Sequence, residues 1–253
     1  MRNMTYRNDS KRTSWDATSE SNRATVPLPE APITASPVPW LTSIHATPGR
    51  GTYGNADYRG NCSGLLIRDL LQFYQPGRVL DPAEGGGTCR DVCKELGIEY
   101  EGRDLRRGFD ATDAASFARL GTFDFIWFHP PYWQMVRYNA GEPRCLSNAP
   151  TLDSFLEQLK RVFRNCRGAL RPGGKLAVLM GDCRQQGRYL GLPFLTLNAA
   201  AEVGFWLAAP EIIRFSHGAT SSRQRYTTAF IPRLHDVCLV LERVRTEAIE
   251  RSA

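Results

Sequence analysis

The sequence predicts an α/β protein, in which an open, mostly parallel sheet carries helices on both faces. Helical and extended patterns alternate from Gly64 to Val244, and a glycine-rich turn at residues 85–87 joins an apolar strand to a helix. Residues 123–128 (FDFIWF) form an aromatic, almost continuously apolar run, which is typical of a central strand buried on both faces. Strands that alternate with helices favour a parallel sheet, and ligands bind such sheets at the carboxyl ends of the strands.

The individual elements follow from periodicity and from the residues that break it. Leucines recur on one face of the first helix, and Pro76-Gly77 ends that helix. Helices are expected over Gly64–Phe73, Thr88–Leu96, Ala114–Leu120, Leu152–Leu170 and Leu195–Val203, and strands over Val79–Leu80, Ile98–Arg103, Phe123–Phe128, Lys175–Met180, Phe205–Phe215 and Asp236–Val244.

The chain divides into a tail and one domain. Residues 1–39 are rich in Ser, Thr, Asn and Pro and contain few clustered apolar residues. Such a segment cannot bury enough apolar surface to offset its ordering entropy, so we expect a disordered tail. Residues 40–253 are expected to form a single domain.

Composition narrows the class of protein. The hydrophobic fraction of 42% and the charged fraction of 23% are ordinary for a globular protein. No apolar run approaches the roughly 18 residues that a membrane span needs, and the first residues lack the apolar core of a secretion signal. Seven scattered cysteines predict reduced thiols in a cytoplasmic protein. Cys89 and Cys93 share a helix face, but no second pair completes a metal site, so packing is the preferred interpretation.

The glycine turn and a later acidic residue predict a nucleoside site. Residues 81–88 (DPAEGGGT) connect a strand to a helix, and consecutive glycines let the backbone approach a ligand closely. Asp104 ends the next strand, where a carboxylate suits hydrogen bonding to both ribose hydroxyls. Dinucleotides and S-adenosylmethionine both fit this pattern, although the turn lacks the GxGxxG spacing typical of NAD sites.

A proline-rich motif follows the aromatic strand. Residues 129–133 (HPPYW) place two prolines at the strand end, where they stop the hydrogen-bond ladder and stiffen the backbone. The motif is therefore expected to direct a carbonyl and an aromatic ring toward the ligand-binding edge of the sheet.

These motifs resemble those of the DNA amino-methyltransferases, which make N6-methyladenine or N4-methylcytosine. The first family motif, D-P-x-x-G-x-G-T, is matched at residues 81–88, and the catalytic motif, (D/N/S)-P-P-(Y/F), at residues 130–132. Residues 58–61 (YRGN) resemble an additional cofactor-binding segment, and residues 170–174 (LRPGG) also look like the family. The resemblance covers roughly residues 52 to 244. It implies a Rossmann-like class I methyltransferase fold, with a mostly parallel seven-stranded sheet, and S-adenosyl-L-methionine as cofactor.

The resemblance also implies site residues. The cofactor would bind Asp81, Pro82, Ala83, Glu84, Gly85, Gly87, Thr88, Asp104, Asp110, Tyr58 and Asn61. The catalytic residues would be His129, Pro130, Pro131 and Tyr132. Two positions depart from the family: Ala83 replaces the usual aromatic residue, and His129 replaces Asp, Asn or Ser. Part of the apolar wall around the cofactor must then come from elsewhere.

The chemistry explains what such a site needs. An exocyclic amine is a poor nucleophile because its lone pair is delocalised into the ring, and most of the rate comes from positioning. The carbonyl of Pro130 and neutral His129 are expected to accept hydrogen bonds from the amine, and Tyr132 to stack on the base. A base inside a duplex must be flipped out to reach the pocket. If His129 keeps its usual pKa, activity should fall on acidification through that value.

The expected substrate is DNA, with RNA as an alternative. The net charge of +6 is compatible with a polyanionic partner but does not identify one. Residues expected to contact it are Trp133, Arg137, Arg223, Arg225 and Tyr226, from two loops rich in cations and rings. Neither loop is long enough for a recognition domain. Specificity should therefore come from these loops, from a second subunit in a homodimer, or from a partner.

Other functions remain compatible with the same residues. The Pro-Pro-Tyr arrangement also serves methylation of RNA base amines and of protein amides, and basic loops favour nucleic acid over the amide. A non-catalytic nucleic-acid-binding module on a decayed fold would explain His129 and Ala83. A Rossmann oxidoreductase fits least well.

Overall fold

The computed structural model describes residues 27–215 and 229–243. Residues 1–32 and 33–253 form separate units, and the second contains every helix and strand of the described residues. Most of the predicted tail, residues 1–26, lies outside the described ranges. Residues 27–39 contain no helix or strand, and Val38 within them is buried.

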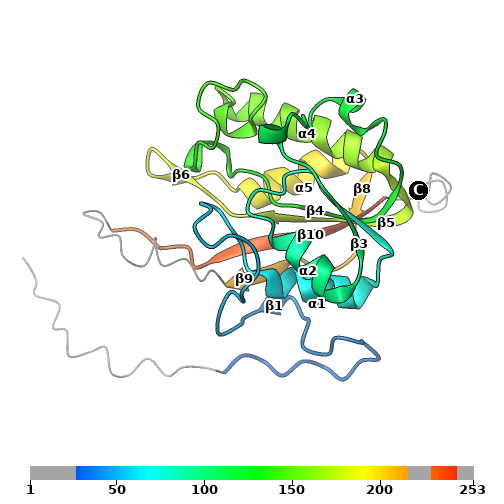
Figure 1. Cartoon of the computed structure of the whole chain (residues 1–253). Helices are drawn as coiled ribbons and strands as arrows, with labels where there is room; N and C mark the ends of the chain where they lie inside the picture. Colours follow the sequence, from blue (N-terminus) through cyan, green and yellow to red (C-terminus); the bar gives the residue numbers. More distant parts are fainter. Residues whose placement is uncertain (1–26, 216–228, 244–253) are drawn as a thin grey trace, which may run out of the picture. The chain divides into compact units, whose positions relative to one another are not determined.

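The second unit is built on one mostly parallel sheet (Figure 1). Seven strands lie in the order β1-β9-β10-β5-β4-β2-β3, and β8 pairs with β10 off this path. Pairs β2–β3, β2–β4, β4–β5 and β1–β9 are parallel, whereas β10 is antiparallel to its neighbours. The strands are β1 (Ile44–His45), β2 (Arg78–Asp81), β3 (Glu99–Gly102), β4 (Phe123–Phe128), β5 (Leu170–Met180), β8 (Phe205–Leu207), β9 (Ile212–Phe215) and β10 (His235–Arg243).

Helices cover both faces of this sheet, which confirms the predicted α/β class. Figure 1 shows α1 and α2 on one face and α4 and α5 on the other. The helices are α1 (Gly64–Tyr74), α2 (Thr88–Leu96), α3 (Ala114–Phe117), α4 (Leu152–Ala169) and α5 (Leu192–Glu202). Three short 3-10 turns, η2 (Leu105–Arg107), η3 (Trp133–Met135) and η4 (Leu146–Asn148), and a hairpin of β6 (Arg184–Gln185) and β7 (Arg188–Tyr189) complete the described elements.

Several predicted elements have other ends in the structure, such as α3, which ends at Phe117, and α5, which begins at Leu192. Two differences go further. The single strand expected over Phe205–Phe215 is two strands, β8 and β9, because the chain turns at residues 208–211, where Pro210 has no N–H to donate to a ladder. Leu170, expected at the end of a helix, instead begins β5. The two-residue strand β1, which pairs with β9, has too little sequence to show a pattern and was not predicted.

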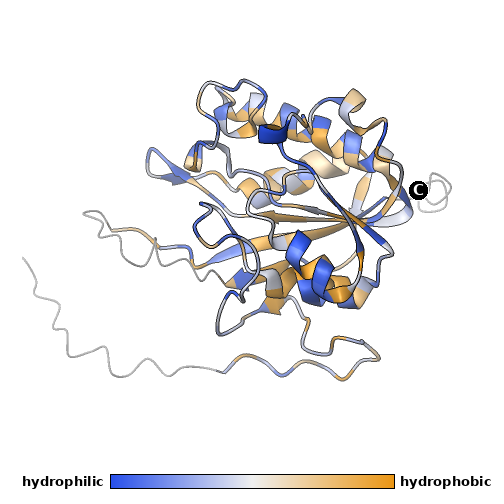
Figure 2. Cartoon of the chain, in the orientation of Figure 1, coloured by the Kyte–Doolittle hydropathy of each residue, from blue (hydrophilic) through white to orange (hydrophobic). Residues whose placement is uncertain are grey.

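The core consists of two apolar layers separated by the sheet (Figure 2). Side chains of a strand alternate between its faces. Phe125 and Trp127 of β4 therefore pack with α1 and α2, and Ile126 and Phe128 pack with α4 and α5. All four are at most 2% exposed, so β4 is buried on both faces as predicted.

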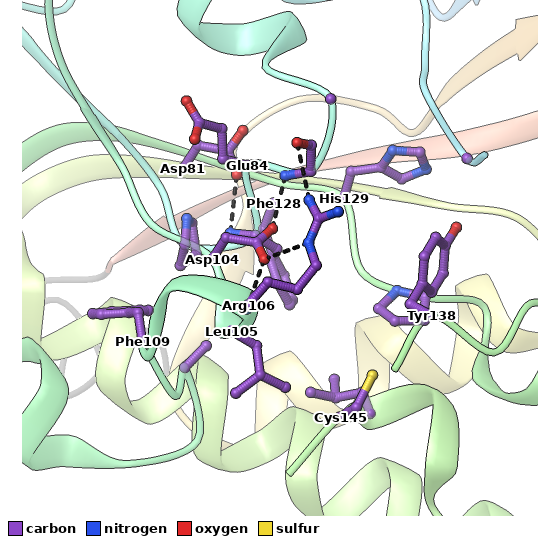
Figure 3. Close-up of a pocket in the computed structure, with 18 of the residues that line it drawn as sticks. Asp81, Glu84, Asp104, Leu105, Arg106, Phe109, Phe128, His129, Tyr138 and Cys145 are labelled. Carbon is purple, nitrogen blue, oxygen red and sulfur yellow. Dashed lines mark hydrogen bonds and ion pairs between the residues drawn. The ribbon is translucent and has the colours of Figure 1, made fainter. Parts of the chain in front are cut away.

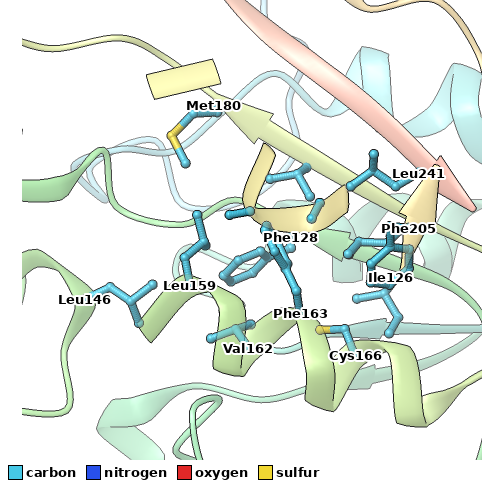
Figure 4. Close-up of a cluster of buried hydrophobic side chains, with 14 of the residues drawn as sticks. Ile126, Phe128, Leu146, Leu159, Val162, Phe163, Cys166, Met180, Phe205 and Leu241 are labelled. Carbon is cyan, nitrogen blue, oxygen red and sulfur yellow. The ribbon is translucent and has the colours of Figure 1, made fainter. Parts of the chain in front are cut away.

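Helix α4 shows how the sequence sets one of these layers. Thr151 and Ser154 form a capping box that satisfies the first amides of the helix. Leu159, Val162 and Phe163 recur at helical spacing and are fully buried against the sheet (Figure 4). The residues between them are polar, which leaves the opposite face of α4 toward solvent.

The seven cysteines are free and buried. Burial raises the pKa of the thiols of Cys62, Cys89 and Cys166, which keeps these side chains protonated and unreactive. Within residues 27–215 and 229–243, no group of three or more His, Cys, Asp or Glu side chains is placed to hold a metal ion. In the same ranges no helix is long and apolar enough to cross a membrane.

Candidate functional site

A pocket opens where β2, β3 and β4 end (Figure 3). It encloses about 1070 Å³ of space, part of it open solvent. Its lining includes ten of the eleven residues predicted for the cofactor: Tyr58, Asn61, Asp81, Pro82, Ala83, Glu84, Gly85, Thr88, Asp104 and Asp110. Gly87, the N-cap residue of α2, does not line the pocket.

The glycine turn has the backbone geometry that its sequence predicts. Gly85 and Gly87 have φ values of +52° and +80°, in the left-handed region that side chains disfavour. A Cβ atom at Gly85 would lie 2.8 Å from the ring of Tyr58. Asp81 secures the start of the turn, since its Oδ1 accepts the N–H of Ala83 at 3.0 Å. Burial raises the pKa of Asp81 well above its ordinary value.

Asp104 lies beside this turn with both carboxylate oxygens engaged. Its Oδ2 accepts the N–H of Gly85 at 3.0 Å, and its Oδ1 accepts the N–H of Arg106 at 2.9 Å and its Nε at 3.1 Å. Burial raises the pKa of Asp104, but these hydrogen bonds outweigh burial and hold the pKa below its ordinary value. Asp104 is therefore an ionised carboxylate. Its Oδ2 keeps one lone pair for a further donor, whereas Oδ1 already accepts two hydrogen bonds.

Glu84 has protein partners. It is 7% exposed and forms ion pairs with Arg107 and, at 3.4 Å, with Arg90. The pairs join the glycine turn to η2 and α2. Glu84 thus lines the pocket and also connects the glycine turn to the two elements beside it.

The segment before α1 folds over the glycine turn. The N–H of Asn55 donates to the carbonyl of Gly86 at 2.8 Å, and the Thr88 hydroxyl donates to Asn61. These contacts bring residues 58–61 to the pocket. The ring of Tyr58 lies between the Arg106 guanidinium, 4.8 Å from its centroid, and the stacked ring of Tyr138 at 6.0 Å.

The apolar wall comes from residues that sequence reasoning missed. Leu105 and Phe109, from the loop after β3, and Leu146 of η4 line the pocket where Ala83 offers only a methyl group. Phe109 is held by Phe117, with ring centroids 5.1 Å apart. Only their position in the sequence could have indicated this role, because Leu105 and Phe109 directly follow the strand that precedes Asp104.

The predicted cofactor residue Asp110 lies in the same loop. It accepts hydrogen bonds from the N–H and the hydroxyl of Thr112, at 2.8 and 2.7 Å.

Two members of the catalytic motif form a pair. His129 Nε2 lies 2.9 Å from the Tyr132 hydroxyl. Burial lowers the pKa of His129 to about 4, reinforced by Arg214 and opposed by Asp236, and burial raises the pKa of Tyr132 well above its ordinary value. Both side chains are therefore neutral near pH 7. The expectation that His129 keeps its usual pKa is corrected, because its ring lies among buried groups.

Of the predicted residues in the motif and the loop after it, some line the pocket and others do not. His129 and Pro131 line the pocket, whereas Pro130 is buried behind it. Trp133 does not face the pocket: it is 7% exposed, and its Nε1 donates to the Ala149 carbonyl at 2.9 Å. This corrects the prediction that Trp133 contacts the substrate, because η3 turns its ring into the core. Arg137 is exposed and lies outside the pocket lining.

Residues far along the chain support the motif. Arg214 of β9 and Asp236 of β10 form a buried ion pair, and each is at most 7% exposed. A side chain at Gly181, at the end of β5, would collide with Tyr132 and Asp236. The pair therefore lies behind the His129–Tyr132 pair. The remaining predicted residues, Arg223, Arg225 and Tyr226, lie outside the described residues.

Comparisons with known proteins give structural similarity only. No protein-family model and no curated protein matches the chain. A candidate DNA modification methylase from Thermus thermophilus, solved in complex with S-adenosyl-L-methionine, is 23% identical over 56% of this chain and 57% of its own, with a TM-score of 0.38. TrmN from the same organism is 18% identical over 74% of this chain and 50% of its own, with a TM-score of 0.40. A methyltransferase from Pyrococcus furiosus is 14% identical over 73% and 84%, with a TM-score of 0.43. The chain spans about half the length of the first two.

Proposed function

We propose that this protein transfers a methyl group from S-adenosyl-L-methionine to an exocyclic amino group of a DNA base, N6 of adenine or N4 of cytosine. One observation carries the proposal. His129 and Pro131, from the motif after β4, line the same pocket as the glycine turn and Asp104. A nucleoside site and a site for an amine thus lie at one edge of the sheet, where ligands of such folds bind.

The chemistry of the pocket fits this cofactor better than a dinucleotide. Three acidic residues other than the buried Asp81, namely Glu84, Asp104 and Asp110, line the pocket, against the cations Arg106 and Arg144. A pyrophosphate needs amides and cations with little opposing negative charge, as at a helix N-terminus without carboxylates beside it. A sulfonium ligand is a cation, which carboxylates favour.

Named residues would hold each part of the cofactor. Asp104 would accept a hydrogen bond from one ribose hydroxyl through the lone pair that Oδ2 keeps beside Gly85, and from the second hydroxyl on Oδ1 in place of the Arg106 side chain. Leu105 and Phe109 would cover the adenine, and Asp110 lies beside them. When bound, the cofactor supplies an electrophilic methyl group on sulfur.

The catalytic pair activates the amine without carrying charge. Neutral His129 has one ring nitrogen that donates and one that accepts. For His129 to accept a hydrogen bond from the amine, Nε2 must carry the hydrogen and donate to the Tyr132 oxygen, which leaves Nδ1 free to accept. The Tyr132 hydroxyl can accept that hydrogen, so its contact with His129 is compatible with the tautomer that the reaction requires. Pro130 does not line the pocket, so His129 and Pro131 are the members of the motif that would meet the amine.

Transfer of tritium from labelled S-adenosylmethionine to mixed-sequence DNA tests the proposal. We expect counts on DNA, and nucleoside digestion then identifies the methylated base. A His129→Ala variant serves as the control for adventitious transfer. Counts on RNA alone would move the substrate to RNA, and calorimetry that detects no cofactor binding would overturn the proposal.

A further inference from the structure

An aromatic and basic surface lies beyond the catalytic motif, at the same edge of the sheet. It is formed by the β6–β7 hairpin and by residues 230–233, which lead into β10. The hydroxyl of Tyr189 donates to the carbonyl of Ile231 at 2.8 Å, and the guanidinium of Arg184 lies 4.6 Å from the ring centroid of Phe230. The two segments therefore form one surface.

The sheet connects this surface to the reaction centre. Strand β5 runs parallel to β4, with Phe128 opposite Val178, so both strands end at the same edge. The hairpin begins four residues after β5 ends, and β10 begins opposite that end, with Val237 paired to Met180. Any strand that delivers a base to His129 would therefore pass close to the hairpin.

The composition of the surface is unusual for one facing only water. Tyr189 is 42% exposed and Ile231 is 86% exposed. Arg184 and Arg188 are exposed beside them, and residues 183–191 and 229–235 contain no acidic residue. Nearby Asp182 accepts the amide N–H groups of Gly191 and Leu192, both at 3.0 Å, and among the described residues it forms no ion pair with Arg184 or Arg188.

The hairpin also has a defined shape. Gln186 and Gly187 have φ values of +47° and +81°, which is the pattern of a two-residue type I′ turn. This turn fixes the pairing of Arg184 with Tyr189 and of Gln185 with Arg188. Arg184 and Tyr189 therefore share one face of this short ribbon, and Arg188 lies on its other face, so a strand that wraps around the ribbon would meet all three side chains.

We propose that the surface made by Arg184, Arg188, Tyr189 and Ile231 binds a strand of the DNA substrate beside the target base. This inference rests on the proposed function, because it names how that site holds its substrate. The two arginines would contact phosphates, and the exposed ring and aliphatic side chain would contact bases. Interleaved cations and aromatic rings are the usual means of holding an unpaired strand.

Fluorescence anisotropy with a labelled 20-nucleotide single strand of mixed sequence, across a salt series, tests the proposal. R184Q/R188Q removes two cations that would each neutralise a phosphate, which should lower the slope of log affinity against log salt by about 1.4. Tyr189→Ser should weaken binding about tenfold, whereas Tyr189→Phe, which keeps the ring, should bind like the parent chain.

The matched control removes two exposed arginines elsewhere. R161Q/R164Q on α4 makes the same change in net charge on the helical face, and it should leave the slope unchanged. The proposal would be overturned if the salt slopes of R184Q/R188Q and R161Q/R164Q were equal, or if the parent chain did not bind the single strand. Circular dichroism of each variant verifies that it is folded.

The same samples separate this inference from the proposed reaction. Binding that depends on the hairpin, without methyl transfer to DNA, would reject the reaction and support the surface. Methyl transfer with binding that ignores the hairpin would reject the surface and leave the reaction. Binding of RNA but not DNA through the same residues would reject DNA as the occupant.

Discussion

The proposed cofactor side of the pocket, formed by the glycine turn and Asp104, and the proposed catalytic side, formed by the proline motif, are held by different kinds of contact. On the cofactor side, Asp81, Glu84 and Asp104 bond to backbone and side chains within about 25 positions of each other. On the catalytic side, the His129–Tyr132 pair is backed by Arg214 and Asp236, from the other half of the sheet. The contacts of the first side form within one stretch of sequence, whereas those of the second form only when distant strands pair in the sheet.

Removal of the imidazole should have the largest effect on activity. His129→Ala leaves the amine without its side-chain acceptor, and we expect kcat to fall about 10²–10⁴-fold, the usual range for a positioned proton acceptor. His129→Asn restores an acceptor oxygen and should recover part of the loss. Steady-state kinetics measures both variants. Equal loss in the two would show that the ring, rather than its acceptor, matters.

The buried ion pair should dominate stability on the catalytic side. Asp236→Asn leaves the guanidinium of Arg214 buried without a counter-charge, and we expect the free energy of unfolding to fall by about 3–5 kcal/mol. The double variant R214L/D236N removes the unpaired charge and should be more stable than the single variant. Urea denaturation measures this difference, and a double variant as unstable as the single would contradict the expectation.

The carboxylate beside the glycine turn should control cofactor affinity. Asp104→Asn removes one charged acceptor, and a hydrogen bond to a charged group contributes about 1.5–3 kcal/mol, so the Kd should rise roughly 10- to 100-fold. Asp113→Asn is the matched control, because Asp113 caps α3 outside the pocket. Titration calorimetry measures both. An unchanged Kd for Asp104→Asn would contradict the proposal that Asp104 binds the ribose of the cofactor.

The local stability of the β6–β7 hairpin should increase when the residue at its first turn position is one that tolerates a left-handed backbone. Gln186 has a left-handed backbone, which Asn tolerates better than Gln. Gln186→Asn should therefore stabilise the hairpin by about 0.5–1 kcal/mol. Hydrogen exchange of the hairpin amides measures local stability, and Gln185→Asn, which lies outside the turn, should give no gain. Faster exchange in Gln186→Asn would argue against the type I′ turn.

Acidification should have little effect until low pH. Transfer requires neutral His129, and burial lowers the pKa of this residue to about 4. Activity should thus be nearly constant from pH 7.5 to 5.5 and halve near pH 4. Initial rates across a pH series measure the profile, with His129→Asn as a variant that lacks the titration. A midpoint near 6.5, the ordinary value for histidine, would show that the ring is solvated.

Strand β4 and the glycine turn were predictable for the same reason. The run FDFIWF has no polar face to expose, and the turn DPAEGGGT tolerates few other backbone paths, so local physics decides both. Trp133 was misassigned because its neighbours predict only that the strand ends. The direction of the ring depends on the Ala149 carbonyl, 16 positions away.

The sequence by itself determined the α/β class, the buried central strand, the glycine turn with Asp104, and the position of the proline motif at a strand end. Each depends on residues within a few turns of one another, where periodicity and backbone preference decide. Only the tertiary structure decided that Leu105 and Phe109 replace the missing aromatic wall, that Tyr132 bonds to His129, and that Arg214 and Asp236 lie behind them. Burial and pairing depend on which strands become neighbours, and sheet order joins segments whose separation in the chain carries no local signal.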